Sequence, residues 1–309
     1  MFPYAYDSLY LGGGTPSLLG SSSLKTLAEA LMGPSLREAS LEVNPEDPVD
    51  LGLLRALGFN RISLAAVSFR EEFLALLGRG HRPGDVFEKV EEARKAGFSN
   101  INLDLLFGLP GQGVRDFEED LRTALSLRPE HMSIYLLEVP RHYRPSLPVA
   151  PDEELRRMYY LAVELLESHG LFQYEVSNFA RKGFESYHNL KYWRYEDYIG
   201  VGPGAASLLG SLRWENKRSL RSYLGRLRRG EEPERTYYPL SAGERVREKA
   251  MMGLRLVEGA DLCGEEEQTV EEIISRARDY PEFFEIEGCR LRLRREHFFV
   301  MNSLLASVL

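Results

Sequence analysis

Short apolar runs alternate with amphipathic stretches along the first half of the chain. Five apolar runs have the length and continuity of buried β-strands, namely Ser8–Leu11, Ser40–Val43, Arg61–Val67, Asn100–Leu106 and Met132–Leu137. Each is followed by a stretch with helical periodicity, namely Leu24–Met32, Leu51–Leu57, Val86–Ala96, Phe117–Leu127 and Glu153–His169. This alternation predicts βαβ units and a parallel sheet, and therefore an α/β fold. The nearly continuous apolar character of the runs indicates a sheet that is covered on both faces.

Polar side chains stand at the carboxyl ends of these predicted strands, where the active sites of α/β proteins lie. They are Thr15, Glu42, Asn44, Ser68, Asp104 and Glu138. Glu42 and Asp104 are the most informative, because a carboxylate within an apolar strand costs free energy unless it binds a partner. A ligand is one such partner, and a buried ion pair is the alternative. Arg79, in the loop after the third strand, either adds positive charge at the same edge or lies exposed.

The first strand ends in three glycines followed by Thr15 and Pro16. Glycine lets a ligand approach backbone N–H groups closely because no Cβ is in the way. The turn therefore indicates a ligand-binding loop, with a plain tight turn as the alternative interpretation.

A polar-aromatic stretch farther along the chain contains His188, Asn189 and Tyr192. Imidazole is a good metal ligand, haem iron included, and aromatic rings suit a flat macrocycle. A structural loop held by ring packing explains the same residues, and the spacing alone favours that interpretation.

The composition excludes several classes of protein. A net charge of −8, from 39 basic and 47 acidic residues, opposes nucleic-acid binding. No apolar run is long enough to span a membrane, and the first residues lack the pattern of a signal peptide. Cys263 and Cys289 are the two cysteines, which is typical of a protein of the reducing cytoplasm. Two thiols far apart in sequence cannot supply a three-thiolate metal site.

The last part of the chain has a different pattern. A charged linker, Glu231–Glu234, precedes helical stretches at Gly243–Met252 and Glu265–Arg278. A hairpin around Glu287 and Gly288 and an apolar helix at Phe298–Val308 follow. We therefore predict two domains, residues 1–230 and residues 231–309, the second small, helical and winged-helix-like.

Several motifs, in order over nearly the whole chain, resemble the oxygen-independent coproporphyrinogen III oxidase-like radical-SAM family. They are Gly12-Gly-Gly-Thr-Pro-Ser-Leu-Leu19, Leu41-Glu-Val-Asn-Pro45, Asn60-Arg-Ile-Ser63, Leu77-Gly-Arg-Gly-His81, Asn100-Ile-Asn-Leu-Asp-Leu-Leu-Phe-Gly-Leu-Pro-Gly-Gln112, Tyr174-Glu-Val-Ser-Asn-Phe-Ala180, His188-Asn-Leu-Lys-Tyr-Trp193, Gly200-Val-Gly-Pro-Gly-Ala205 and Met252-Gly-Leu-Arg255. The His-Asn-x-x-Tyr motif is similar to that of the haem-chaperone branch rather than the oxidase.

The resemblance implies a partial (β/α)6 barrel that holds S-adenosylmethionine beside a 4Fe–4S cluster. It implies that the cofactor meets the residues matching the family's binding motifs, which are Gly13, Gly14, Thr15, Glu42, Arg79 and Asp104. It also implies that His188, Asn189 and Tyr192 hold haem, with His188 as the metal ligand.

The chain departs from the family pattern in three places. In the family a first strand with a Cys-x-x-x-Cys-x-x-Cys loop precedes the glycine turn, and Met1 stands just before that turn's strand here. Val67 replaces a glutamine of the family, and Ala206 replaces a histidine. We therefore expect a barrel without its first strand and no radical-SAM catalysis.

Two functions follow from the resemblance. One is a non-catalytic cytoplasmic protein that binds haem or a porphyrin and delivers haem to an accepting protein. The other is an incomplete chain of a radical-SAM enzyme of porphyrin metabolism. The free edge of Ser8–Leu11 would then pair with a second copy of the chain, be covered by the first residues, or result from an incomplete sequence.

Overall fold

The computed structural model describes residues 5–138 and 148–309, and the chain divides into two compact units, residues 1–188 and 189–309. Glu138 is the last described residue before the gap. The division predicted at residues 230 and 231 falls inside the second unit and stays a prediction.

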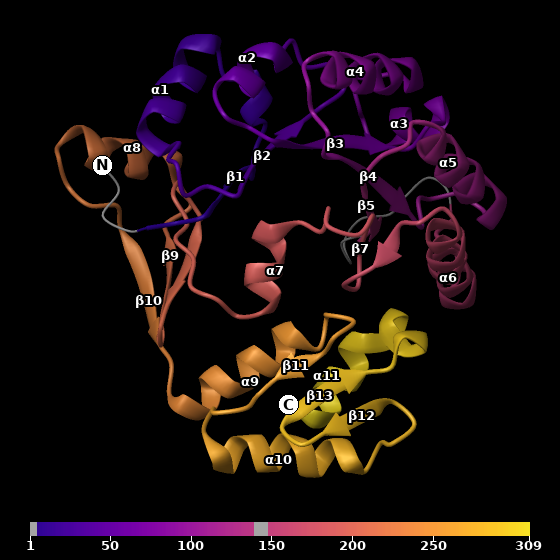
Figure 1. The fold of residues 1–309 in the computed structure, drawn as a ribbon, viewed down its shortest axis with the longest axis vertical. Helices are drawn as coiled ribbons and strands as arrows, with labels where there is room; N and C mark the ends of the chain where they lie inside the picture. The colour runs from indigo at the N-terminus through magenta and orange to yellow at the C-terminus, as the bar shows by residue number, and fades with distance from the viewer. Residues whose placement is uncertain (1–4, 139–147) are drawn as a thin grey trace. The chain divides into compact units, whose positions relative to one another are not determined.

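The first unit is built on one sheet with the strand order β1-β2-β3-β4-β5-β7-β6. β1 to β5 are parallel, and β5 pairs with β7 in the antiparallel sense (Figure 1). The strands are β1 (Ser8–Leu11), β2 (Glu38–Val43), β3 (Arg61–Val67), β4 (Ile101–Phe107), β5 (His131–Leu136), β6 (Phe172–Gln173) and β7 (Asn178–Ala180). The predicted parallel α/β sheet is therefore confirmed.

Helices cover the outer side of this sheet, as the ribbon shows (Figure 1). They are η1 (Pro16–Leu18), α1 (Ser21–Leu31), α2 (Leu51–Ala56), α3 (Glu71–Leu76), α4 (Pro83–Lys95), α5 (Val114–Ser126) and α6 (Asp152–Ser168). Leu41, Ile62 and Leu103, from three neighbouring strands, are fully buried in the core between sheet and helices. Local chemistry sets where helices begin: the Asp50 side chain accepts the N–H of Leu53, and Pro83 opens α4.

β1 is the first strand of the sheet order, and among the described residues only β2 pairs with it. Its four residues are half-buried. An edge of this kind carries backbone groups that a further strand could pair with. Association of two copies through this edge stays a prediction.

The second unit begins with a small antiparallel sheet. Its strands are β8 (Ala206–Leu209), β9 (Leu212–Asn216) and β10 (Arg235–Pro239), in the order β10-β9-β8. α8 (Leu220–Arg228) connects β9 to β10. The charged linker predicted at Glu231–Glu234 therefore leads into a strand of this sheet.

A helix–strand–helix–hairpin module follows. It consists of α9 (Ala242–Gly253), β11 (Ala260–Asp261), α10 (Glu267–Arg278), β12 (Phe284–Glu287), β13 (Arg290–Leu293), η2 (Arg295–Val300) and α11 (Met301–Val308). The strand order β11-β13-β12 gives the winged-helix-like arrangement expected from the sequence. The hairpin turns at Gly288, whose φ of 61° favours glycine.

The two cysteines are far apart in sequence but lie next to each other in the structure. β11 pairs with β13 so that Asp261 faces Arg290, and the Leu262 N–H donates to the Cys289 carbonyl. This pairing brings Cys263 and Cys289, 26 residues apart in sequence, to a Cα–Cα distance of 5.2 Å, and they form a disulfide. Disulfides are uncommon in a reducing cytoplasm, so the cytoplasmic location stays a prediction.

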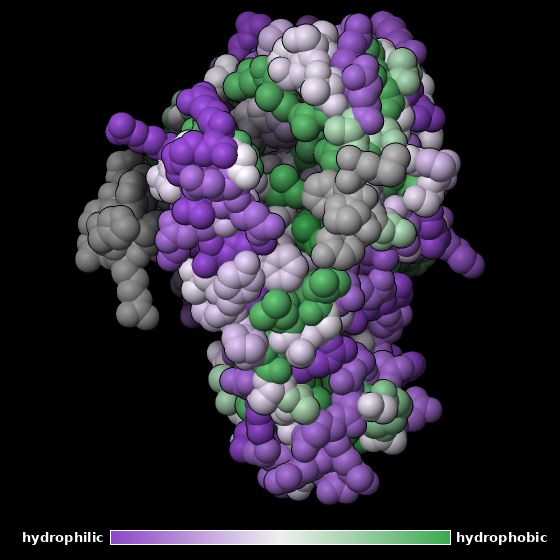
Figure 2. Space-filling model, turned by 90° about the vertical axis from the view of Figure 1, so that its left-hand side faces the viewer, coloured by the Kyte–Doolittle hydropathy of each residue, from purple (hydrophilic) through white to green (hydrophobic). Residues whose placement is uncertain are grey.

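Hydrophilic side chains dominate the face shown in Figure 2, with smaller hydrophobic groups between them. Some apolar side chains of α8 and β10 are well exposed, among them Leu220, Leu227 and Tyr237. No helix among residues 5–138 and 148–309 is both long and apolar enough to cross a membrane.

The disulfide generates a stability prediction for the second unit. The disulfide closes a loop between residues 26 apart in sequence. This restricts the unfolded chain and should raise the free energy of unfolding of the unit by about 3 kcal/mol. Both tryptophans, Trp193 and Trp214, belong to this unit, so their fluorescence reports its unfolding. We expect a reductant to shift the urea midpoint of the wild type to lower concentration. The double variant Cys263→Ser/Cys289→Ser should not respond to the reductant, and a wild type with one midpoint in both conditions contradicts the prediction.

Candidate functional site

The glycine turn after β1 packs directly against a carboxylate of β2. A Cβ on Gly12 would lie 2.6 Å from Glu42 Oε1 and 2.6 Å from the Tyr10 ring, so any other residue there would have to displace these two side chains. Gly13 has a φ of 77°, and its N–H donates to Glu42 Oε2 over 3.3 Å. Gly14 and Thr15 are exposed. Of the three glycines of the turn, Gly12 therefore packs most tightly, although it was not among the predicted site residues.

Glu42 is held from two sides. The Tyr10 hydroxyl donates to Oε1 over 2.9 Å, and the Gly13 N–H approaches Oε2. Burial raises the pKa of Glu42; the hydrogen bond from Tyr10 opposes this shift, and the charge of Asp104 adds to it. Ionising a buried carboxyl costs free energy, and a cationic ligand beside it would offset that cost. Glu42 is therefore suited to bind a cationic group.

Asp104 lies on β4 and belongs to the same electrostatic cluster as Glu42. Its carboxylate accepts hydrogen bonds from Ser63 Oγ at 2.9 Å and from Asn102 Nδ2 at 2.8 Å. Burial raises its pKa, and these hydroxyl and amide donors oppose the rise. The structure thus brings together the two carboxylates that the strand pattern indicated.

Arg79 has no hydrogen bond or ion pair with Glu42 or Asp104 among the described residues. Its backbone N–H donates to Leu74, while its side chain is exposed and makes no hydrogen bond or ion pair with a described residue. Its cofactor role stays a prediction. The cation that acts on Asp104 is Arg61, which is 2% exposed at the start of β3 and lowers the pKa of that carboxyl. Arg61 was not among the predicted site residues, because arginine at a strand start is usually exposed.

The end of β3 is strained. Val67 has a φ of 66°, in the left-handed region that a β-branched residue rarely adopts, and the register with β4 shifts between Leu64 and Val67. Asp120 of α5 holds the following residues, since it accepts Ser68 Oγ at 2.6 Å and the Phe69 N–H at 2.7 Å. Val67, which replaces a glutamine of the family, therefore lies at a strained strand end.

His188 lies in helix α7 (Tyr187–Trp193), a segment for which the spacing had favoured a loop. Its Nδ1 is 2.9 Å from Ser8 Oγ, and its ring stacks on Tyr10 at a centroid distance of 5.3 Å and an interplanar angle of 19°. Glu38 of β2 accepts the N–H groups of Tyr187 at 2.9 Å and of His188 at 3.0 Å. These contacts fix the imidazole against β1 and β2.

Tyr10 therefore links the two predicted groups of site residues, because it contacts Glu42 with its hydroxyl and His188 with its ring. Asn189 and Tyr192 follow on α7. The Tyr192 ring packs edge-on against Tyr198 at 4.6 Å, and burial raises its pKa to about 12, with Tyr198 adding to the shift.

The cysteines of these 309 residues do not fit an iron–sulfur cluster. A 4Fe–4S cluster is held by several thiolates, and the two cysteines here are bonded to each other. We therefore derive no step through a cluster.

Comparisons with known proteins show which family the chain belongs to. The Radical SAM superfamily model matches residues 2–124. The haem chaperone HemW of Bacillus subtilis is 38% identical over 266 residues, covering 82% of this chain and 70% of the relative. The haem chaperone HemW of Mycobacterium tuberculosis H37Rv is 35% identical over 270 residues, covering 83% of this chain and 69% of the relative.

The chain belongs to the HemW haem-chaperone family.

A solved structure extends the likeness to the fold of nearly the whole chain. Coproporphyrinogen III oxidase (HemN) from Escherichia coli has a TM-score of 0.83 and 22% identity, covering 98% of this chain and 77% of that one. The predicted radical-SAM-type fold and the haem-chaperone branch are thus confirmed. The individual site residues are not tested by these comparisons.

Asp120 generates a pH prediction. Burial raises its pKa to about 6 from the usual 3.8, so the folded state favours the protonated acid. The resulting stability is present below about pH 4 and is lost as pH rises through 6, by about 3 kcal/mol in total. In Asp120→Asn this loss should disappear, as measured by urea unfolding followed by circular dichroism. Glu119→Gln, an exposed neighbour on α5, serves as the control; a pH profile of Asp120→Asn that matches the wild type contradicts the prediction.

Proposed function

We propose that this chain binds haem through helix α7, with His188 as iron ligand and Asn189 and Tyr192 beside it, and hands haem to an accepting protein. The observation that carries the proposal is the fixed position of His188. Its ring contacts Ser8 and stacks on Tyr10, and its backbone N–H donates to Glu38. An orienting hydrogen bond on the second ring nitrogen is usual for a metal-bound histidine. Since Ser8 engages Nδ1, the ligand atom would be Nε2.

We further propose that S-adenosylmethionine binds at the turn after β1. The residues fit its charge, because Glu42 and Asp104 present two carboxylates and S-adenosylmethionine carries a cationic sulfonium and an ammonium group. The Gly13 backbone and the exposed Gly14 and Thr15 leave room for close approach. Beside a reduced cluster this cofactor supplies radical chemistry; the cysteines present here do not fit that cluster, so the proposal for this chain is binding alone.

The radical-SAM enzyme of porphyrin metabolism remains the second candidate on fold alone. Among residues 5–138 and 148–309, no contact favours it over haem binding.

The haem proposal predicts the effect of one substitution. His188→Ala should weaken haem binding at least about tenfold and shift the Soret band, because the iron loses its imidazole. The measurement is a haem titration followed by absorbance, with competition against apomyoglobin for the affinity. His169→Ala, at the end of α6, is the matched control and should behave as the wild type. An unchanged Soret band in His188→Ala rules out this ligand, and a wild type without any Soret band rules out the function.

The cofactor proposal predicts a charge effect at Glu42. Glu42→Gln should bind S-adenosylmethionine at least about tenfold more weakly at pH 8, since it removes one carboxylate from the cationic end. Because the pKa of Glu42 is raised, the wild-type affinity should increase as pH rises through that pKa. Equilibrium dialysis measures both effects, with the exposed Glu29→Gln of α1 as control. Equal affinity of Glu42→Gln and wild type at pH 8 excludes the proposed contact.

A further inference from the structure

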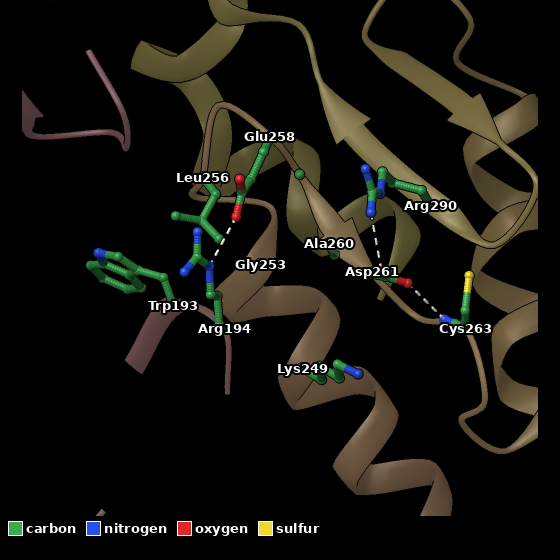
Figure 3. A pocket seen from close by; sticks show the side chains of 11 residues that line it. Trp193, Arg194, Lys249, Gly253, Leu256, Glu258, Ala260, Asp261, Cys263 and Arg290 are labelled. Atoms are coloured by element: carbon green, nitrogen blue, oxygen red, sulfur yellow. Dashed lines mark hydrogen bonds and ion pairs between the residues drawn. The ribbon is translucent and has the colours of Figure 1, made fainter. Parts of the chain in front are cut away.

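A cavity in the second unit has a disulfide at its edge. Its volume is about 390 Å³, and its lining includes Trp193, Lys249, Asp261, Cys263 and Arg290 (Figure 3). Asp261 ends β11, Cys263 follows two residues later, and Arg290 begins β13. Neither the haem nor the S-adenosylmethionine proposal uses these residues.

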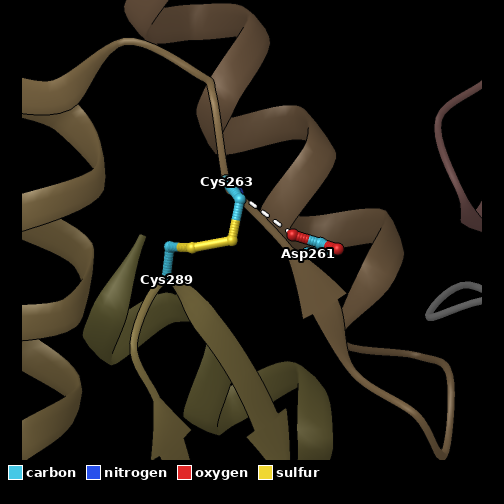
Figure 4. A group of neighbouring side chains, drawn as sticks. All are labelled: Asp261, Cys263 and Cys289. Atoms are coloured by element: carbon cyan, nitrogen blue, oxygen red, sulfur yellow. Dashed lines mark hydrogen bonds between the residues drawn. A yellow bond between two sulfur atoms is a disulfide. The ribbon is translucent and has the colours of Figure 1, made fainter.

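Three possible metal-ligand atoms meet at this edge. The Asp261 carboxylate and the two sulfurs of Cys263 and Cys289 lie within 4.8 Å of one another (Figure 4). They come from two antiparallel segments whose pairing holds them together: Asp261 faces Arg290, and Leu262 bonds to Cys289. The backbone pairing thus holds the three side chains together in addition to the S–S bond.

We propose that the reduced chain binds a Zn²⁺ ion through Cys263, Cys289 and Asp261. A dithiol reductant breaks the S–S bond: the disulfide takes up two electrons and two protons to give two thiols, and the dithiol becomes a disulfide. Metal binding then releases the two thiol protons and joins both thiolates to the ion. The disulfide and the metal site are thus alternative states of the same pair.

The spacing suits tetrahedral zinc. With Zn–S bonds of about 2.3 Å, two sulfurs on one ion stand about 3.8 Å apart, which rotation of the two side chains reaches once the S–S bond is broken. The carboxylate supplies a third ligand of a type that zinc accepts. Asp261 and Cys263 both line the cavity, so the fourth position faces it and takes water or a small ligand.

Neighbouring groups already orient the carboxylate. Asp261 Oδ1 accepts the Cys263 N–H at 3.1 Å, and Oδ2 pairs with the Arg290 guanidinium at 3.1 Å. A carboxylate oxygen has a second lone pair, so Oδ1 can keep its N–H bond while it binds the metal. Arg290 acts as the positioning residue of the site.

Cobalt titration of the full chain tests the proposal. The protein is reduced with a phosphine under anaerobic conditions, and Co²⁺ is followed by absorbance. The wild type should bind one Co²⁺ per chain with a sulfur-to-cobalt charge-transfer band, which Zn²⁺ abolishes. The oxidised protein should show no such band. Asp261→Asn should bind at least about tenfold more weakly, and Arg290→Gln should show a smaller loss.

Controls separate this site from others and from misfolding. His188→Ala should keep the full charge-transfer band, because the proposed ligands lie elsewhere in the chain. If single cysteine variants fold poorly, alkylation of the reduced wild type gives a second measure, since Zn²⁺ should protect both thiols from iodoacetamide. Absence of the charge-transfer band in the reduced wild type, or thiols that react equally with and without Zn²⁺, overturns the proposal. Unchanged affinity in Asp261→Asn overturns the assignment of the third ligand.

Discussion

The candidate site of the first unit depends on Tyr10, which contacts both Glu42 and His188. Its hydroxyl donates to Glu42, and its ring stacks on His188. A Cβ on Gly12 would displace this tyrosine and this glutamate, which lie against it. The glycine turn, the β2 carboxylate and the start of α7 are therefore packed around one aromatic side chain, so a change at any of them displaces the others.

Burial also sets the electrostatics of the first unit's buried carboxyl groups. Glu42, Asp104 and Asp120 all have raised pKa values, and in each the first cause is desolvation. Hydrogen-bond donors oppose the shift without abolishing it: Ser63 of β3 donates to Asp104, and the Phe69 N–H, just after β3, donates to Asp120. A parallel sheet covered on its outer side by helices makes such an arrangement costly, and the strained Val67 adds to that cost. Costs of this kind are usual where a protein binds a ligand.

The second unit follows a different principle. Its winged-helix-like module has short strands and a disulfide that joins the end of β11 to the hairpin. Short strands offer few ladder hydrogen bonds, and a covalent or metal link between them restricts the unfolded chain more than any one side-chain contact would. The same two sulfurs thus serve either as a link or as ligands, depending on redox state.

The sequence by itself determined the alternation of strands and helices, the glycine turn, and the order of the motifs that place the chain in its family. These features depend on local periodicity and on residues close together in the chain. Arg61 as a buried cation, Gly12 as the tightest point of the turn, α7 as a helix and the Cys263–Cys289 bond were decided by the tertiary structure alone. The physical reason is distance along the chain: Ser8 meets His188 across 180 residues and Tyr10 meets Glu42 across 32. Contacts over such separations depend on how the strands and helices pack, and no local pattern encodes them.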